Sequence, residues 1–277
     1  MIPAPFDYQR AESVDQAIGF LGENEDAKLL AGGHSLLPLM KLRLARPSVL
    51  IDIGRLSDLS YVREDGDHMA IGALTRHHDV HGSPLLSQHC ALLAHTAGLI
   101  GDPQVRHMGT IGGSVAHGDP ASDVPTILLA LDAEVVARGP NGSRTIPAAS
   151  FFKGLFETDL SPQEVLTEIR VPKLGAGTGW SYQKFHRRAQ DWAMVGVAAV
   201  VKNGSANAAV AFTNMGETPL RASAVEQAVS GGADPAEASQ QAAVGTNPPS
   251  DTFATADYRR ELAKVLTRRA LEEALAG

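Results

Sequence analysis

The chain of 277 residues contains a single cysteine, Cys90. One cysteine excludes an intrachain disulfide, an iron–sulfur cluster held by cysteines of this chain alone, and a CxxC redox pair. If the protein carries electrons, it therefore does so with an organic cofactor. Cys90 itself is expected to be a small buried residue within a helix.

Basic residues are also scarce. The chain has 24 Lys and Arg against 31 Asp and Glu, which gives a formal net charge of −7. This balance argues against nucleic-acid binding, which requires a basic surface. A polyphosphate ligand would have to be held by local backbone dipoles rather than by a general positive field.

Long apolar runs are missing as well. The longest, Ala193 to Val201, is far shorter than the roughly 20 residues that cross a bilayer as a helix. The start MIPAPFDYQR has no cationic stretch followed by an apolar one, so no signal peptide is expected. We therefore predict a cytoplasmic protein without a transmembrane segment.

The hydrophobic pattern predicts an α+β chain with two domains, residues 1–172 and 173–277. The first domain divides into lobes at about 1–56 and 57–172. Helices are expected from Ser13 to Gly22, from the loop after Ala31 through Leu44, over Ser83–Leu99 and over Ser122–Leu131.

The second domain is predicted to hold a three-stranded antiparallel sheet followed by helices. The strands are expected at Gly179–Arg187, Ala193–Val201 and Ala206–Thr213, with Asn203-Gly204 as the last hairpin turn. The final helix is expected from Asp257, with Leu262, Val265, Leu266 and Leu271 on one face.

Two glycine-rich segments are the strongest candidates for chemistry. The first is Ala31-Gly32-Gly33-His34-Ser35-Leu36-Leu37-Pro38, and the second is Gly109-Thr110-Ile111-Gly112-Gly113-Ser114. Glycines permit positive φ and close approach of backbone N–H groups to an anion, and a following helix adds its dipole. Two such loops could together hold a diphosphate, although glycine pairs in loops are more often ordinary turns. Neither segment matches G-x-G-x-x-G or G-x-x-x-x-G-K-[ST].

A cluster of histidines suggests a metal site, because His77, His78 and His81 fall within five residues. Further ligands in a defined geometry do not stand out, so a packed or solvated cluster is expected, with no metal site. His34 and His117 are better placed to contact phosphate or to orient a loop. No Ser-His-Asp order or paired carboxylate motif is visible, and no catalytic residue is expected in this chain.

The stretches AGGHSLLPLMKLRLARPSVLIDI and GDPQVRHMGTIGGSVAHGDPASDVPTILLALDAEV resemble the two FAD signatures of the molybdenum-hydroxylase flavoproteins. This family includes the FAD domain of xanthine dehydrogenase and the medium subunit of carbon monoxide dehydrogenase. The similarity covers essentially the whole chain, including the start MIPAPFDY and the end DYRRELAKVLTRRALEEAL. It implies a two-lobed FAD-binding domain of the vanillyl-alcohol-oxidase (PCMH) type, with a C-terminal α+β domain packed against it.

The resemblance also implies which residues bind FAD. The diphosphate and its adjoining sugar would lie on Ala31, Gly32, Gly33, His34, Ser35 and Leu36 and on Thr110, Ile111, Gly112, Gly113 and Ser114. Asp123 would accept a hydrogen bond from FAD, Lys184 would lie near the isoalloxazine ring, and Ile100 and Leu166 would contact the flavin or the adenine. Simpler alternatives are that Asp123 caps its helix, that Lys184 is solvated, and that Ile100 and Leu166 are core residues.

Trp192 stands where the family carries an aromatic residue over the flavin. Carbon monoxide dehydrogenases usually have tyrosine there, and this departure bears on both the ring face and the substrate class.

By resemblance, the chain is the electron-transfer subunit of a carbon monoxide dehydrogenase, which converts CO and water to CO2. Electrons would come from a small [2Fe–2S] subunit, while a large subunit with a molybdopterin cofactor oxidises the substrate. They would leave through FAD to an acceptor such as quinone, which allows peripheral contact with a membrane. A heterohexamer, as a dimer of heterotrimers, is expected. The alternatives are a hydroxylase for a purine, an aldehyde or an N-heterocycle such as nicotine, a stand-alone FAD oxidase, and a binding module without electron transfer.

Overall fold

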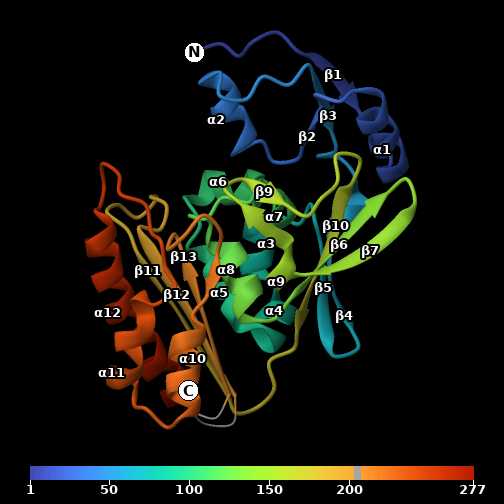
Figure 1. The fold of residues 1–277 in the computed structure, drawn as a ribbon. Coiled ribbons are helices and arrows are strands. Elements are labelled where there is room, and N and C mark those ends of the chain that lie inside the picture. Colours follow the sequence, from blue (N-terminus) through green and yellow to red (C-terminus); the bar gives the residue numbers. More distant parts are fainter. Residues whose placement is uncertain (203–206) are drawn as a thin grey trace.

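A computed structural model describes residues 1–202 and 207–277, so the predicted Asn203-Gly204 turn lies outside the described residues. Over these residues the chain is α+β, with three main sheets. Its buried apolar residues form three hydrophobic clusters, and one of them extends from the second lobe into the C-terminal sheet. Figure 1 shows the N-terminal lobe in blue, a central layer of green helices, and the C-terminal sheet and helices in orange and red. Among the described residues, no helix combines the length and the apolar character that crossing a membrane requires.

The N-terminal lobe contains a parallel three-stranded sheet in the order β1-β3-β2. Helix α1 (Val14–Glu23) is capped by Ser13, whose side chain accepts the N–H of Gln16. Its apolar face, formed by Val14, Ala17, Ile18 and Leu21, is buried. Helix α2 (Leu36–Lys41) is shorter than predicted, because the backbone takes a left-handed φ of 60° at Arg43. The strands are β1 (Asp7–Arg10), β2 (Lys28–Leu30) and β3 (Val49–Asp52).

The second lobe contains an antiparallel five-stranded sheet in the order β4-β5-β10-β6-β7. Its hairpin turns contain Gly66 and Gly142, which both have a positive φ. The strands are β4 (Val62–Asp65), β5 (His68–Gly72), β6 (Glu134–Gly139), β7 (Gly142–Pro147) and β10 (Val165–Pro172). Short elements are η1 (Ser57–Leu59), α9 (Ala148–Phe151), β8 (Phe152–Gly154) and β9 (Glu157–Thr158).

The helices of this lobe are shorter and more numerous than predicted. The single helix expected over Ser83–Leu99 is wrong, because the chain breaks at Cys90, where φ is −153° and ψ is 60°. Cys90 is fully buried at this break rather than inside a helix. The glycine-rich stretch after Gly101 is also largely helical. The helices are α3 (His77–Gly82), α4 (Pro84–His89), α5 (Ala91–Gly98), α6 (Pro103–Met108), α7 (Ile111–His117) and α8 (Asp123–Ala130).

The C-terminal part contains an antiparallel sheet in the order β11-β12-β13-β14. The three predicted strands are present, but the sheet is four-stranded, because the short strand β14 pairs with β13. This edge strand is two residues long and carries no alternating pattern that would reveal it. The strands are β11 (Thr178–Phe185), β12 (Val195–Lys202), β13 (Asn207–Thr213) and β14 (Leu220–Arg221).

The two faces of this sheet have different partners (Figure 1). Helix α12 (Ala256–Ala276) covers one face, with α10 (Ser223–Ser230), α11 (Pro235–Ala238) and η3 (Ser239–Ala243) beside it. Leu266 and Leu271 are buried as predicted, whereas Val265 is exposed and Arg259 is buried instead. The other face packs on α5 and α8, so that this sheet and the second lobe share one hydrophobic core.

Candidate cofactor site

A cavity of about 1120 Å³ lies where the two lobes and the C-terminal sheet meet. Such a volume suits a ligand at least as large as the drug-sized molecules that usually occupy protein pockets. All but one of the predicted site residues line it, from elements far apart in the sequence. They are Ala31, Gly32, Gly33, His34, Ser35, Leu36, Ile100, Thr110, Gly112, Gly113, Ser114, Asp123, Leu166, Lys184 and Trp192.

Ile111 is the exception. Its side chain is fully buried in the hydrophobic core of the second lobe. Its backbone N–H donates to the carbonyl oxygen of Thr75 at 3.0 Å. Neither group is therefore free to contact a ligand, because both are used to fix the start of α7 to the lobe.

The first glycine segment has the geometry of an anion-binding loop. Gly33 has a φ of +74°, as the sequence predicted for a glycine here. Within the described part of the chain, the backbone N–H groups from Gly32 to Leu36 have no hydrogen-bond acceptor, either along the backbone or on a side chain. Consecutive unpaired N–H groups before a helix form a concave, partially positive surface that attracts an anion.

Gly32 brings this segment against the second one. A Cβ atom on Gly32 would overlap the carbonyl oxygen of Met108 and lie 2.9 Å from the Cα atom of Gly109. Only glycine permits this approach of two backbones. The Arg76 guanidinium also donates to the Met108 carbonyl, and the backbone N–H of His77 donates to the carbonyl of Gly109 at 3.0 Å.

The second glycine segment is a helix N-terminus rather than an open loop. Thr110 caps α7 and accepts the N–H of Gly113 at 3.1 Å. The N–H of Gly112 donates to the carbonyl of Ala73, and that of Ser114 donates to the carbonyl of Thr110. The expectation that this segment offers a row of free N–H groups is therefore wrong. It presents a close backbone and two hydroxyls, that of Thr110 and that of Ser114.

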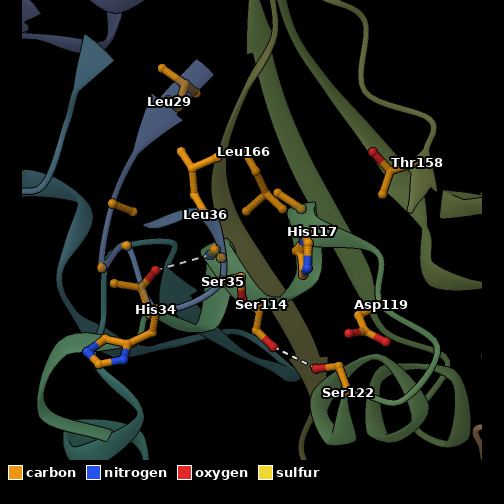
Figure 2. A pocket seen from close by; sticks show the side chains of 18 of the residues that line it. Leu29, His34, Ser35, Leu36, Ser114, His117, Asp119, Ser122, Thr158 and Leu166 are labelled. Atoms are coloured by element: carbon orange, nitrogen blue, oxygen red, sulfur yellow. Dashed lines mark hydrogen bonds between the residues drawn. The ribbon is translucent and has the colours of Figure 1, made fainter. Parts of the chain in front are cut away.

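Figure 2 shows the polar and apolar walls of the cavity. The Ser114 hydroxyl lies 2.8 Å from that of Ser122 at the start of α8. Leu36 and Leu166 form adjoining apolar walls, and Leu166 also belongs to the core, with 5% of its surface exposed. Ile100 likewise packs against the core while it lines the cavity. These two residues therefore line the cavity and also belong to, or pack against, the hydrophobic core.

A buried ion pair closes the cavity at the C-terminal sheet. Lys184 Nζ lies 2.7 Å from Asp123 Oδ2, and both side chains are almost fully buried. Asp123 Oδ1 accepts the hydroxyl of Tyr182 at 2.6 Å. The N-cap of α8 is Ser122, so Asp123 does not cap the helix, and Lys184 is not solvated. Both simpler alternatives for this pair are wrong.

Trp192 lines the cavity from the loop after β11 and is 59% exposed. Its neighbours in that loop, Gln190 and Asp191, also face the cavity, and Arg188 pairs with Asp191 at 3.1 Å. The indole is thus available at the open side of the cavity, where it can cover a ligand.

Some lining residues carried no clear signal in the sequence. The β8–β9 hairpin places Phe156 and Thr158 at the cavity, and the Phe156 ring lies 5.0 Å from that of His117. Burial lowers the pKa of His117, although nearby Asp119 opposes this, and burial raises the pKa of Asp119. His117 and Asp119 lie within the second signature, but the hairpin lies outside both signatures.

The predicted histidine cluster is partly packed and partly solvated, because His77 is buried whereas His78 and His81 are exposed. His78 stacks on His107 with ring centroids 3.9 Å apart, and His81 Nδ1 lies 3.0 Å from the carbonyl oxygen of Ala94. Burial lowers the pKa of His77 to about 4, and the charges of Arg106 and His34 act in the same direction. In the described ranges, no three His, Cys, Asp or Glu side chains are grouped as metal ligands would be.

Comparison with known proteins matches both parts of the chain. The family described as "FAD binding domain in molybdopterin dehydrogenase" matches residues 4–174. The "CO dehydrogenase flavoprotein C-terminal domain" matches residues 180–274. These matches agree with the predicted fold class.

Individual relatives span nearly the same length. The carbon monoxide dehydrogenase medium chain of Hydrogenophaga pseudoflava is 45% identical, covering 100% of this chain and 99% of the relative. The glyceraldehyde dehydrogenase medium chain of Sulfolobus acidocaldarius is 41% identical, covering 99% of each chain. A solved structure of carbon monoxide dehydrogenase from Hydrogenophaga pseudoflava superposes with a TM-score of 0.96 and 46% identity, covering 100% of this chain and 99% of the other.

Proposed function

The chain belongs to the family of FAD-binding flavoprotein subunits of molybdopterin dehydrogenases, and on that premise we propose that it is the electron-transfer subunit of a carbon monoxide dehydrogenase, with FAD in the cavity described above. Bound FAD supplies the electron-transfer chemistry, while the protein binds, orients and electrostatically tunes it. The observation that carries the site proposal is the strip of N–H groups from Gly32 to Leu36, for which the described residues supply no acceptor, set against the start of α7.

Each part of the cavity suits one part of FAD. The strip of N–H groups would hold the diphosphate, which explains how an acidic chain binds a polyphosphate with few basic side chains. The hydroxyls of Thr110 and Ser114 would complete that contact. Lys184 would lie near the isoalloxazine ring, and Trp192 would cover the ring from the open side. Ile111 has no place in this proposal, because its side chain lies in the core.

The domain division at residues 172 and 173 is part of the same proposal. Residues 1–172 would hold most of the cofactor, and residues 173–277 would contribute the ammonium of Lys184 and the indole of Trp192.

The remaining cofactors belong to other chains in this proposal. A [2Fe–2S] cluster usually needs four cysteine ligands, and this chain has only Cys90. A small [2Fe–2S] subunit would therefore deliver electrons, and a large molybdopterin subunit would oxidise the substrate. Two such three-subunit units would assemble, and a quinone would accept the electrons.

Carbon monoxide is favoured as the substrate because medium chains of that enzyme from two organisms match this chain over its full length, at 45% and 40% identity. A second candidate is an aldehyde, since the medium chain of a glyceraldehyde dehydrogenase is 41% identical. The substrate pocket would lie in the large subunit, so the identity of that subunit decides between carbon monoxide and an aldehyde.

The test uses the complex purified with its native partners and, separately, this chain loaded with FAD. Each is treated anaerobically with carbon monoxide or with glyceraldehyde, and the flavin band near roughly 450 nm is followed. We expect carbon monoxide to bleach the flavin in the complex and to leave that of the isolated chain unchanged. Bleaching by glyceraldehyde alone would support the second candidate. Rapid bleaching of the isolated chain by either substrate would contradict the subunit proposal.

A further inference from the structure

A line of hydrogen bonds runs from the cavity wall into the C-terminal sheet. It begins at Lys184 and Asp123, which line the cavity, and continues through the hydroxyl of Tyr182. The Tyr182 hydroxyl lies 3.2 Å from Thr213 Oγ1, which lies 2.7 Å from Thr126 Oγ1. The last three residues do not line the cavity, so any influence they have on a ligand must pass through the first two.

The sheet is built to accommodate this line. Gly196 on β12 pairs with Lys184 on one side and with Thr213 on the other. A Cβ atom on Gly196 would lie 2.5 Å from the Tyr182 hydroxyl and 2.7 Å from Thr213 Oγ1. Any larger residue would therefore push the two hydroxyls apart. Tyr182 is 5% exposed and Thr213 is fully buried, so both hydroxyls depend on these partners.

Two hydrogen bonds fix the position of the Lys184 ammonium group. Its ammonium carries three N–H donors. One bonds to Asp123 Oδ2 at 2.7 Å and one to the carbonyl of Leu99 at 3.0 Å. Within the described residues the third donor has no acceptor, and Lys184 lines the cavity, so this donor is available to a ligand.

Tyr182 fixes the carboxylate that holds this ammonium. By donating to Asp123 Oδ1, the Tyr182 hydroxyl leaves Oδ2 for Lys184 and sets the plane of the carboxylate. Burial, and after it the charge of Asp123, raises the pKa of Tyr182 well above its usual value, so the hydroxyl stays a donor. The same bond withdraws negative charge from the carboxylate, which leaves more of the positive field of Lys184 for the cavity.

We propose that Tyr182 is a positioning residue that acts through Asp123 and Lys184 to raise the reduction potential of the flavin. This inference rests on the proposed function, because it assumes that the cavity holds FAD. Reduction adds electrons to the ring, and a fixed positive charge in a buried site stabilises the added negative charge. Loss of the Tyr182 hydroxyl would strengthen the negative field of Asp123 and loosen Lys184. Both changes lower the potential.

The test is Tyr182→Phe in the full chain loaded with FAD. The midpoint potential is measured by anaerobic titration against a reference dye. We expect the equilibrium between oxidised and reduced flavin to shift about tenfold toward the oxidised form, or ~30 mV for a two-electron couple. The matched control is Tyr61→Phe, which removes a hydroxyl that also donates to a buried carboxylate, that of Glu168, at 2.6 Å. Neither residue lines the cavity, so the potential should not change.

A second pair of variants keeps the test decisive if Tyr182→Phe does not fold. Thr213→Val removes the hydroxyl on the far side of Tyr182 and should lower the potential. Thr213→Ser keeps that hydroxyl, so its potential should equal that of the unmodified chain. An unchanged potential in a folded variant that retains FAD overturns the proposal. So does loss of FAD from a folded variant, because Tyr182 would then act on binding. Failure of the unmodified chain to bind FAD contradicts the proposed function instead.

Discussion

Replacing one hydrogen by a methyl group at Gly32 tests whether the two glycine segments must touch to bind FAD. The new Cβ would overlap the Met108 carbonyl oxygen and lie 2.8 Å from the Met108 carbonyl carbon. These are backbone atoms, which cannot rotate away as the end of a side chain can, so the segments must separate. Overpacking of this kind costs about 1–3 kcal/mol. If that cost falls on the bound state, Gly32→Ala should raise the Kd for FAD roughly 5- to 150-fold.

The assay is a titration of the FAD-free chain with FAD, followed by quenching of flavin fluorescence. Thermal unfolding of the same samples without FAD shows whether the fold survives. Gly19→Ala is the matched control, because Gly19 lies in helix α1 of the same lobe and a Cβ there meets nothing within 4 Å. The Gly19→Ala chain should bind FAD with an unchanged Kd, and the substitution should stabilise helix α1 by about 1 kcal/mol. A Gly32→Ala chain that binds FAD with the Kd of the unmodified chain would refute the contact argument.

Two further predictions concern the cofactor linkage and acid stability. In our proposal hydrogen bonds hold the diphosphate, so FAD should be bound noncovalently. Acid precipitation should then leave a colourless protein pellet and a yellow supernatant. A yellow pellet would contradict this prediction. His77 has its pKa lowered by burial to about 4, below its usual 6.5, so the unfolded chain takes up the proton first as the pH falls. The contribution of His77 to the free energy of unfolding is therefore fully present above pH 6.5 and is lost as the pH falls toward 4. Between pH 7 and pH 5 this loss amounts to roughly 2 kcal/mol. Urea unfolding at both pH values should show a smaller loss for His77→Gln, and an equal loss would count against the shift.

The first glycine segment shows what the sequence could predict. Its features are local, since a strand, two glycines and a helix follow one another within a few residues. The positive φ of Gly33 and the placement of Ala31–Leu36 at the cavity agree with that pattern. The Ser13 cap of α1 and the hairpin turn at Gly66 were predictable for the same reason.

The second glycine segment shows what the sequence could not predict. Its N–H groups are used by the carbonyls of Ala73 and Thr75, which lie far away along the chain. No local pattern reveals which donors tertiary contacts will occupy. The helix break at Cys90 has the same origin, because it lets a buried residue pack into the core at the cost of helix continuity. Val265 was misplaced because the buried face of α12 shifts to include Arg259.

The C-terminal sheet shows why sequence domains and binding sites need not coincide. Tyr182 and Ala198 belong to the same hydrophobic core as the helices of the second lobe. Asp123, on that lobe, is buried against the ammonium of Lys184 from the sheet. A chain cut after residue 172 would leave this carboxylate without its cation and the lobe without one wall of its core. Removing one partner of a buried ion pair typically costs about 3–5 kcal/mol. Residues 173–277 are therefore required both for the stability of the second lobe and for the charge that faces the cavity.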